Sequence, residues 1–97
     1  MNLVENSRVS KISITSSNYS HHVVSGGRYT DGVVTTPFGF VRVYAEANFW
    51  ALEFIWSGKS YHFGTRCKEL PSDRALTRRA SRFAKEVVQK NLNELIS

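Results

Sequence analysis

The sequence predicts a single α+β domain: an antiparallel β-meander of three to four strands, packed on one face by a long C-terminal α-helix. Two observations predict this fold. Residues 33–66 contain short runs rich in Val, Phe, Tyr, Trp and Thr, and turn residues separate these runs. Residues 72–94 carry apolar side chains at the spacing of an amphipathic helix. A chain of 97 residues suffices for one small core, so we expect residues 1–97 to form one domain.

The first 30 residues contain few apolar side chains, and we expect them to be irregular. Residues 9–15, "VSKISIT", alternate between apolar and polar positions and predict a weak strand. Residues 16–32 mix Ser, Asn, Gly and Asp, a composition typical of a long loop, interrupted at most by a short strand at Val23–Val24.

The β-meander is predicted from residue 33 onward. Strands are expected at residues 40–46, 49–56 and 60–65, and residues 33–36 form the fourth strand of the longer version. The breaks between these runs contain Pro, Gly, Asn and Ser, which favour tight turns.

A two-residue turn at Ala47–Asn48 would place Arg42 opposite Glu53. Side chains alternate between the two faces of a sheet, so this register sorts the strands into an apolar face and a mixed face. The next turn falls at Ser57–Gly58 or one residue later, and both versions give the same apolar face. That face would hold Val41, Val43, Ala45, Trp50, Leu52, Phe54, Tyr61 and Phe63.

The helix is predicted to begin after Pro71, with Ser72 as its N-cap and Asp73 near the positive end of the helix dipole. Its apolar side chains fall on one arc, and most of its charged side chains are basic and fall on the opposite arc. The candidate binding residues of the basic arc are Arg74, Arg78, Arg79, Arg82 and Lys85. Only Glu86 interrupts this positive run, so the arc is either a solvated polar face or a surface that binds phosphates or an acidic protein.

The mixed face of the sheet supplies the other candidate residues. In the simplest interpretation, Arg42 forms a cross-strand ion pair with Glu53. Phe40 and Ile55 would be exposed on this face unless residues 1–30 or a partner cover them. The candidate binding residues here are Arg42, Tyr44, His62 and Arg66.

Basic residues outnumber acidic ones in this chain. Thirteen Lys and Arg against eight Asp and Glu give a net charge of +5, which attracts nucleic acid or an acidic protein surface. No apolar run approaches the roughly 18 residues of a membrane helix, and the first residues lack the pattern of a signal peptide. We therefore expect a cytoplasmic protein without a membrane partner. Cys67 stands alone, so an internal disulfide is excluded.

No motif for catalysis, metal binding or cofactor binding occurs in the sequence. The soft metal ligands are His21, His22, His62 and Cys67, and no carboxylate stands at a supporting spacing, so no metal site is predicted. Cys67 and His62 are a conceivable nucleophile and base, but no group orients either of them. We expect a protein that is not an enzyme and has no cofactor and no small-molecule substrate.

Three short elements stand in an order that is found in a known family. "GFVR" at residues 39–42, "WALEF" at 50–54 and "GKSYHFGT" at 58–65 precede an alanine-containing helix. Over about residues 39–90, this order resembles the ethylene-response-factor DNA-binding domain and the related arm-site-binding N-terminal domain of phage tyrosine recombinases. The resemblance implies a three-stranded sheet backed by a helix, with the sheet face away from the helix laid in the major groove of DNA.

The resemblance also implies which residues would face DNA. Most of these positions are arginine or tryptophan in the plant-type family, whereas here only Arg42 is basic. Arginine contributes much of the base readout in a major groove, so the sheet of this chain departs from the family at the positions that matter for DNA. Carried over by position, the DNA-facing residues are Arg42, Tyr44, Glu46, Ile55, Ser60 and His62.

The sequence favours a small basic module that binds nucleic acid, most of all double-stranded DNA, in a phage, a plasmid or another mobile element. In this hypothesis the sheet residues contact the DNA and the helix cations attract its phosphates. The alternative hypothesis is a small inhibitor of the anti-CRISPR or another anti-defence type, which docks on a host protein complex. The small size and the lack of a catalytic set agree with both.

Overall fold

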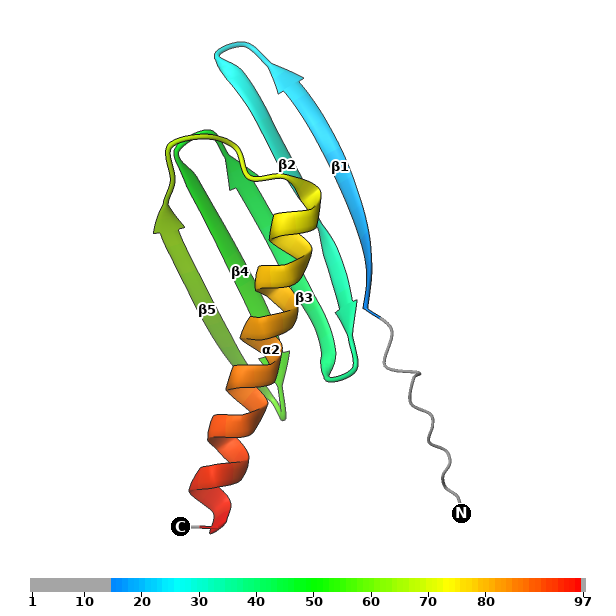
Figure 1. Ribbon diagram of the computed structural model, residues 1–97, viewed down its shortest axis with the longest axis vertical. Helices are drawn as coiled ribbons and strands as arrows, with labels where there is room; N and C mark the ends of the chain where they lie inside the picture. The colour runs from blue at the N-terminus through cyan, green and yellow to red at the C-terminus, as the bar shows by residue number, and fades with distance from the viewer. Residues whose placement is uncertain (1–14, 97) are drawn as a thin grey trace.

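The computed structural model describes residues 15–96 and confirms the α+β class. Its elements are β1 (Ser16–Val24), β2 (Gly27–Thr36), β3 (Gly39–Glu46), β4 (Phe49–Trp56), β5 (Lys59–Arg66) and the helix α2 (Asp73–Ile96). Figure 1 shows the strands side by side in chain order, with α2 lying across one face of the sheet. The predicted β-meander and covering helix are present, and the sheet has five strands rather than three or four.

Neighbouring strands are antiparallel, and the predicted register between β3 and β4 is confirmed, with Arg42 opposite Glu53. The turn between β4 and β5 lies at Ser57–Gly58, the first of the two predicted positions. Both turn residues have a positive φ, 53° and 80°, as a type I′ turn requires. The predicted apolar residues therefore share the sheet face that α2 covers.

The predicted loop at residues 16–32 is wrong, because β1 and most of β2 lie there, joined by a turn at Ser25–Gly26. β1 is an edge strand, so its polar side chains can stay in water while its backbone pairs with β2. Its main contact with the core is the ring of Tyr19, which lies over Gly32 of β2. The strand predicted at residues 9–15 falls outside the described residues except for Thr15, which precedes β1.

The core lies between α2 and the sheet face that α2 covers. The backbone N–H of Ala75 donates to Ser72 Oγ at 3.1 Å, which confirms the predicted N-cap. Phe63 was expected under the helix but is half exposed, because α2 packs on β1 to β4 and makes fewer contacts with β5. The buried apolar side chains are Val34, Val41, Val43, Ala45, Trp50, Leu52, Phe54, Leu76, Ala80, Ala84, Val87 and Val88.

Polar contacts tie the edge strand β1 to the first turns of α2. The hydroxyl groups of Tyr19 and Thr77 share a hydrogen bond of 2.8 Å. Two residues further along β1, the imidazole Nε2 of His21 donates to both carboxylate oxygens of Asp73, at 2.8 and 2.9 Å. These contacts fix the edge of the sheet to the helix in the absence of a large apolar interface there.

We expect Tyr19→Phe to lower the free energy of unfolding by about 1 kcal/mol at neutral pH, because the substitution removes the hydrogen bond to Thr77 and keeps the ring. Thermal and urea unfolding would measure the loss. Tyr44→Phe is the matched control, since Tyr44 is exposed and does not link β1 to α2. An equal loss in both variants would contradict the role of Tyr19 in holding β1.

The same residue predicts an alkaline loss of stability. Burial raises the pKa of the Tyr19 phenol above its ordinary value of 10.0, and the hydrogen bond to Thr77 offsets part of that rise. The fold therefore favours the neutral phenol, so this contribution to stability is complete below pH 10.0 and is lost as the pH rises through the raised pKa. Unfolding measured across alkaline pH should show a shallower decline in Tyr19→Phe than in the unsubstituted protein.

Candidate functional site

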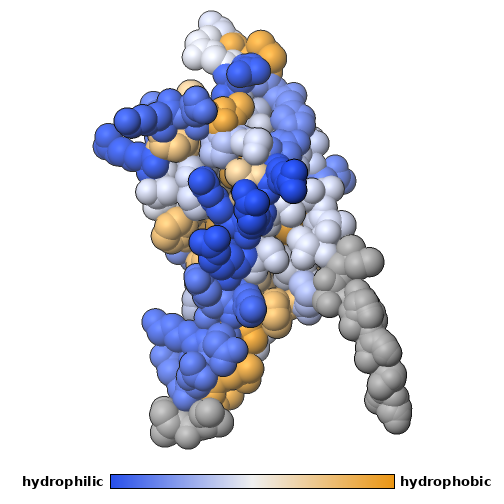
Figure 2. Space-filling model, in the orientation of Figure 1, coloured by the Kyte–Doolittle hydropathy of each residue, from blue (hydrophilic) through white to orange (hydrophobic). Residues whose placement is uncertain are grey.

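The candidate residues of the helix form one continuous surface, which we call the basic stripe: Arg74, Arg78, Arg79, Arg82 and Lys85. All five are exposed on the side of α2 that points away from the sheet or along its flank. Figure 2 shows hydrophilic side chains gathered along α2 on this side of the molecule. No ion pair joins any of the five to another residue within the described range of 15–96. Within that range no carboxylate neutralises their charge.

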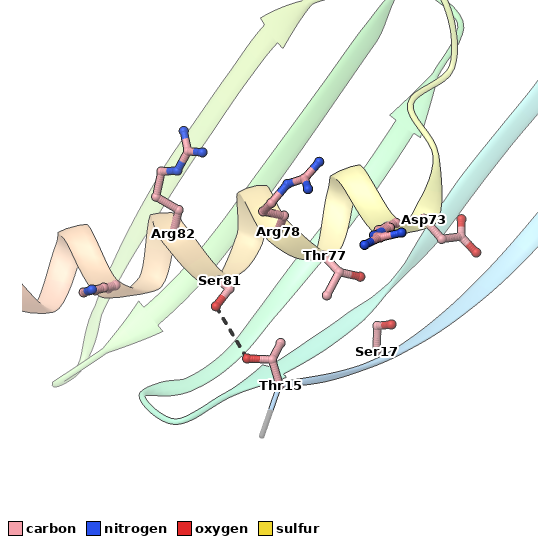
Figure 3. Close-up of a pocket in the computed structure, with 9 residues that line it drawn as sticks. Thr15, Ser17, Asp73, Thr77, Arg78, Ser81 and Arg82 are labelled. Carbon is pink, nitrogen blue, oxygen red and sulfur yellow. Dashed lines mark hydrogen bonds between the residues drawn. The ribbon is translucent and has the colours of Figure 1, made fainter. Parts of the chain in front are cut away.

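A groove with a volume of ≈ 750 Å³ runs between the basic stripe and β1. Figure 3 shows Thr77 and Ser81 directed toward β1, where Ser81 contacts Thr15 at 3.5 Å, while Arg78 and Arg82 project on the other side of the helix axis. The groove combines cationic side chains with hydroxyl groups that can donate hydrogen bonds. Its lining residues are Thr15, Ser17, Asp73, Arg74, Thr77, Arg78, Ser81, Arg82 and Lys85.

Asp73 is the one carboxylate that lines this groove. Its two oxygens accept hydrogen bonds from His21, so the carboxylate is directed toward β1 rather than toward the arginines. It also lies in the first turn of α2, where the helix dipole favours a negative charge. Asp73 thus serves the fold and forms no ion pair with the basic stripe.

Arg79 lies at the far edge of the basic stripe and has a different partner. Its guanidinium carbon is 4.9 Å from the ring centroid of Trp50, a distance typical of a cation–π contact. This contact holds the side chain over the sheet without neutralising its charge. A smaller groove of ≈ 330 Å³ opens here between α2 and β5, with Phe63 and Phe83 among its lining residues.

The candidate residues of the strands lie together on the opposite side of the molecule, on the face of the sheet that points away from α2. We call this the open sheet face. Glu53 stands in its centre and pairs with Arg42 at 3.5 Å and with His62 at 3.7 Å. The predicted ion pair between Arg42 and Glu53 is therefore present, although the Arg42 side chain remains 75% exposed. Its long distance and exposure make it a weak contribution to stability.

An aromatic row crosses one end of the open sheet face. The His22 ring stacks on Tyr29 with centroids 4.4 Å apart, and the Tyr29 ring lies 5.7 Å from Tyr44. Tyr44 donates a hydrogen bond of 2.6 Å to Glu46, and this bond raises the pKa of the Tyr44 phenol. His22 and Tyr29 are not among the predicted candidates, because the composition of their segment favours a loop. Placing "RYT" on a strand after the turn signal "SGG" would have found Tyr29.

The open sheet face is not basic. Its cations are Arg42 and Arg66, and its carboxylates are Asp31, Glu46 and Glu53, so acidic groups exceed basic ones by one. The described part of the chain leaves this face uncovered, because β1 extends the sheet at its edge instead of folding across it. The nine candidate residues therefore form two surfaces, on opposite sides of the sheet, rather than one site.

The groups considered for chemistry have separate partners. Cys67 Sγ donates to the backbone carbonyls of Glu46 and Ala47 at 3.6 and 3.8 Å, whereas His62 pairs with Glu53. Between residues 15 and 96, no three His, Cys, Asp or Glu side chains are grouped so that they could hold a metal ion. In the same range no helix has the length and apolar character needed to cross a membrane.

No protein-family model matches this chain, and neither does any curated protein or solved structure. The resemblance to the ethylene-response-factor domain stays a prediction. The function has to be inferred from the chemistry of the two surfaces.

Proposed function

We propose that this protein binds nucleic acid through the basic stripe on α2, and that its preferred ligand is double-stranded DNA. One observation carries the proposal. Five cationic side chains lie exposed within about three helical turns, and none has a carboxylate partner among residues 15–96. Most surface cations of a folded protein have acidic neighbours nearby, so an unpaired group of this size favours a polyanionic ligand.

The dimensions of the basic stripe agree with a phosphate backbone. With a rise of 1.5 Å per residue, Arg74 and Lys85 lie about 16 Å apart along α2, which corresponds to about five base-pair steps along the axis of a duplex. The hydroxyl groups of Thr77 and Ser81 point toward β1 and are hydrogen-bonded to Tyr19 and Thr15, so the phosphate contacts rest on the cations. Contacts of this kind hold a duplex without reading its sequence.

The open sheet face is the less suitable surface for DNA, although the family resemblance implies that face. Glu46 and Glu53 would stand close to phosphates and repel them, and Asp31 adds a third negative charge. Among the positions that the family resemblance assigns to DNA contact, only Arg42 suits bidentate recognition of a base. We therefore place DNA on α2, with the sheet residues in another role.

A titration across a salt series tests the proposal. If each cation of the basic stripe neutralises one phosphate, the logarithm of the binding constant should fall against the logarithm of the salt concentration with a slope of about −4.5 for duplex DNA. Fluorescence anisotropy with duplex, single-stranded DNA and RNA would compare the three ligands. If no binding is observed at about 50 mM salt, the proposal is overturned. The partner of the basic stripe would then be an acidic protein surface, such as that of a host complex.

A further inference from the structure

The open sheet face carries more exposed apolar surface than a sheet in water normally does. Phe40 is 66% exposed and Ile55 is 58% exposed, and the side chains of Phe49 and Val33 are exposed as well. Phe40, Ile55 and Val33 come from three adjacent strands and form a connected patch, whereas Phe49 lies near the other end of β4, beyond the row of Arg42 and Glu53. Contiguous apolar surface of this kind usually marks an interaction site.

We propose that a second copy of this chain covers the open sheet face, forming a symmetric dimer in which two sheets stack face to face. The twofold axis lies midway between the two sheets. It runs parallel to the strands, above the gap between β3 and β4. Such an axis places β3 of one copy over β4 of the other, and β2 over β5. Stacked sheets about 10 Å apart are a common way to bury two half-apolar faces.

The register of the sheet makes this arrangement self-complementary in charge. Arg42 and Glu53 lie directly opposite each other on β3 and β4 of the same chain. The proposed axis therefore puts Arg42 of each copy over Glu53 of the second copy, and the contact occurs twice. Two unlike charges meet at each place, whereas a cross-strand axis through the row of Arg42 and Glu53 would oppose Arg42 with another Arg42.

Two further pairs of positions match under the same axis. Two residues along the strands from Arg42 and Glu53, Phe40 of one copy meets Ile55 of the other. On the flanking strands, Tyr29 shares a cross-strand row with Arg66, so each tyrosine ring comes to face an arginine of the second copy. An arginine over an aromatic face is a favourable contact.

The composition of β1 agrees with this axis. Four strands find a counterpart, β2 with β5 and β3 with β4, and β1 overhangs the interface because the sheet has five strands. On the open sheet face β1 presents polar side chains over most of its length, and these are Ser16, Asn18, Ser20 and His22. The strand that would stay in water is thus the polar one.

The size of the interface predicts its strength. Four strands about 4.8 Å apart, each about eight residues long at about 3.3 Å per residue, present about 500 Å² of flat sheet, and the relief of the side chains adds to this area. The interface then falls at the lower end of stable complexes, which bury about 600 to 1,000 Å² per partner. We therefore expect a dimer with a dissociation constant in the micromolar range. The dimer does not depend on nucleic-acid binding, because both basic stripes face outward.

Sedimentation velocity tests the dimer, over concentrations from about 1 to about 200 µM, which bracket a micromolar dissociation constant. We expect the protein to change from monomer to dimer over this range. Phe40→Lys with Ile55→Lys should keep it monomeric at every concentration. The matched control is Val23→Lys, because Val23 is 81% exposed but points to the side of the sheet that carries α2. Thermal unfolding would show that each variant is folded.

A charge exchange tests the position of the axis. Arg42→Glu alone would oppose Glu53 of the second copy with a like charge and should weaken the dimer at least about tenfold. Adding Glu53→Arg to the same chain restores both unlike pairs and should restore the dimer. Failure of the double substitution to restore it, a monomer at about 200 µM in the unsubstituted protein, or a dimer that resists the lysine substitutions would each overturn the proposal.

Discussion

Replacing two central cations of the basic stripe by Arg78→Glu with Arg82→Glu is expected to lower the affinity for duplex DNA by at least about 100-fold near physiological salt, and to reduce the salt slope by about two. Both side chains are exposed and lack an ion-pair partner among the described residues, so the fold should tolerate the substitution. The loss arises because two phosphate contacts disappear and two repulsive charges replace them. Fluorescence anisotropy over several salt concentrations measures both quantities.

Two control variants separate this effect from the change in net charge. Lys59→Glu with Lys68→Glu alters the charge by the same amount at exposed positions outside the basic stripe, and only a small loss is expected. Arg42→Glu with Arg66→Glu alters the open sheet face instead. If that pair abolished binding while the helix variant kept it, DNA would lie on the sheet, as the family resemblance implies, and our assignment of the basic stripe would be wrong.

The largest expected effect on folding comes from a single methyl group in β2. In Gly32→Ala, the new Cβ would overlap the backbone carbonyl oxygen of Asn18 and lie 2.7 Å from the Tyr19 ring and 2.9 Å from its Cα. Backbone atoms cannot move aside as the end of a side chain can, so β1 would have to separate locally from β2. We expect the free energy of unfolding to fall by about 3 kcal/mol, which urea unfolding would measure.

Gly64→Ala in β5 is the matched comparison. Its new Cβ would meet the ring of Phe49 at 3.1 and 3.3 Å, and an exposed ring can shift by a few tenths of an ångström. Alanine also restricts the unfolded chain more than glycine does, so we expect a change of less than about 1 kcal/mol in either direction. If both substitutions cost the same, the close approach of β1 to Gly32 would not be the reason for the first effect.

Much of the fold could be predicted because two different periodicities divide the chain. Runs rich in Val, Phe, Tyr and Trp predict the strands, and the turn at Ala47–Asn48 specifies the register between β3 and β4, which is confirmed. The helix predicted at residues 72–94 is present at Asp73–Ile96. Its start could be predicted because Pro71 and the N-cap Ser72 mark it. In these segments the hydrophobic pattern and the turn residues indicate the same structure.

The first hairpin could not be predicted on the same grounds. β1 contains Ser, Asn and His, which individually favour turns, and only Tyr19 reaches the core among its side chains. What stabilises this strand is backbone pairing with β2 and contacts with α2, and both depend on residues far away in the sequence. Propensity is a weak guide where tertiary contacts decide the conformation.

The candidate residues were predictable as types but not as a spatial arrangement. The basic stripe follows directly from helical spacing, so its five members were found together. The groove beside it was not foreseen, because it requires β1 to lie next to α2, and Thr15 and Ser17 belonged to segments that had no predicted contact with the helix. In the same way, the excess of carboxylates on the open sheet face became visible only once Asp31 had a place on a strand.

The link between β1 and α2 also has a consequence for how the chain acquires its structure. The hairpins join sequence neighbours, whereas the contacts between Tyr19 and Thr77 and between His21 and Asp73 close loops of 58 and 52 residues. Local pairings form early and distant ones later, since loop closure must precede the contact. During synthesis on a ribosome, the strands can therefore pair while the apolar face of the sheet is still exposed to water. The core is closed off from water only when α2, which emerges after the five strands, packs over it.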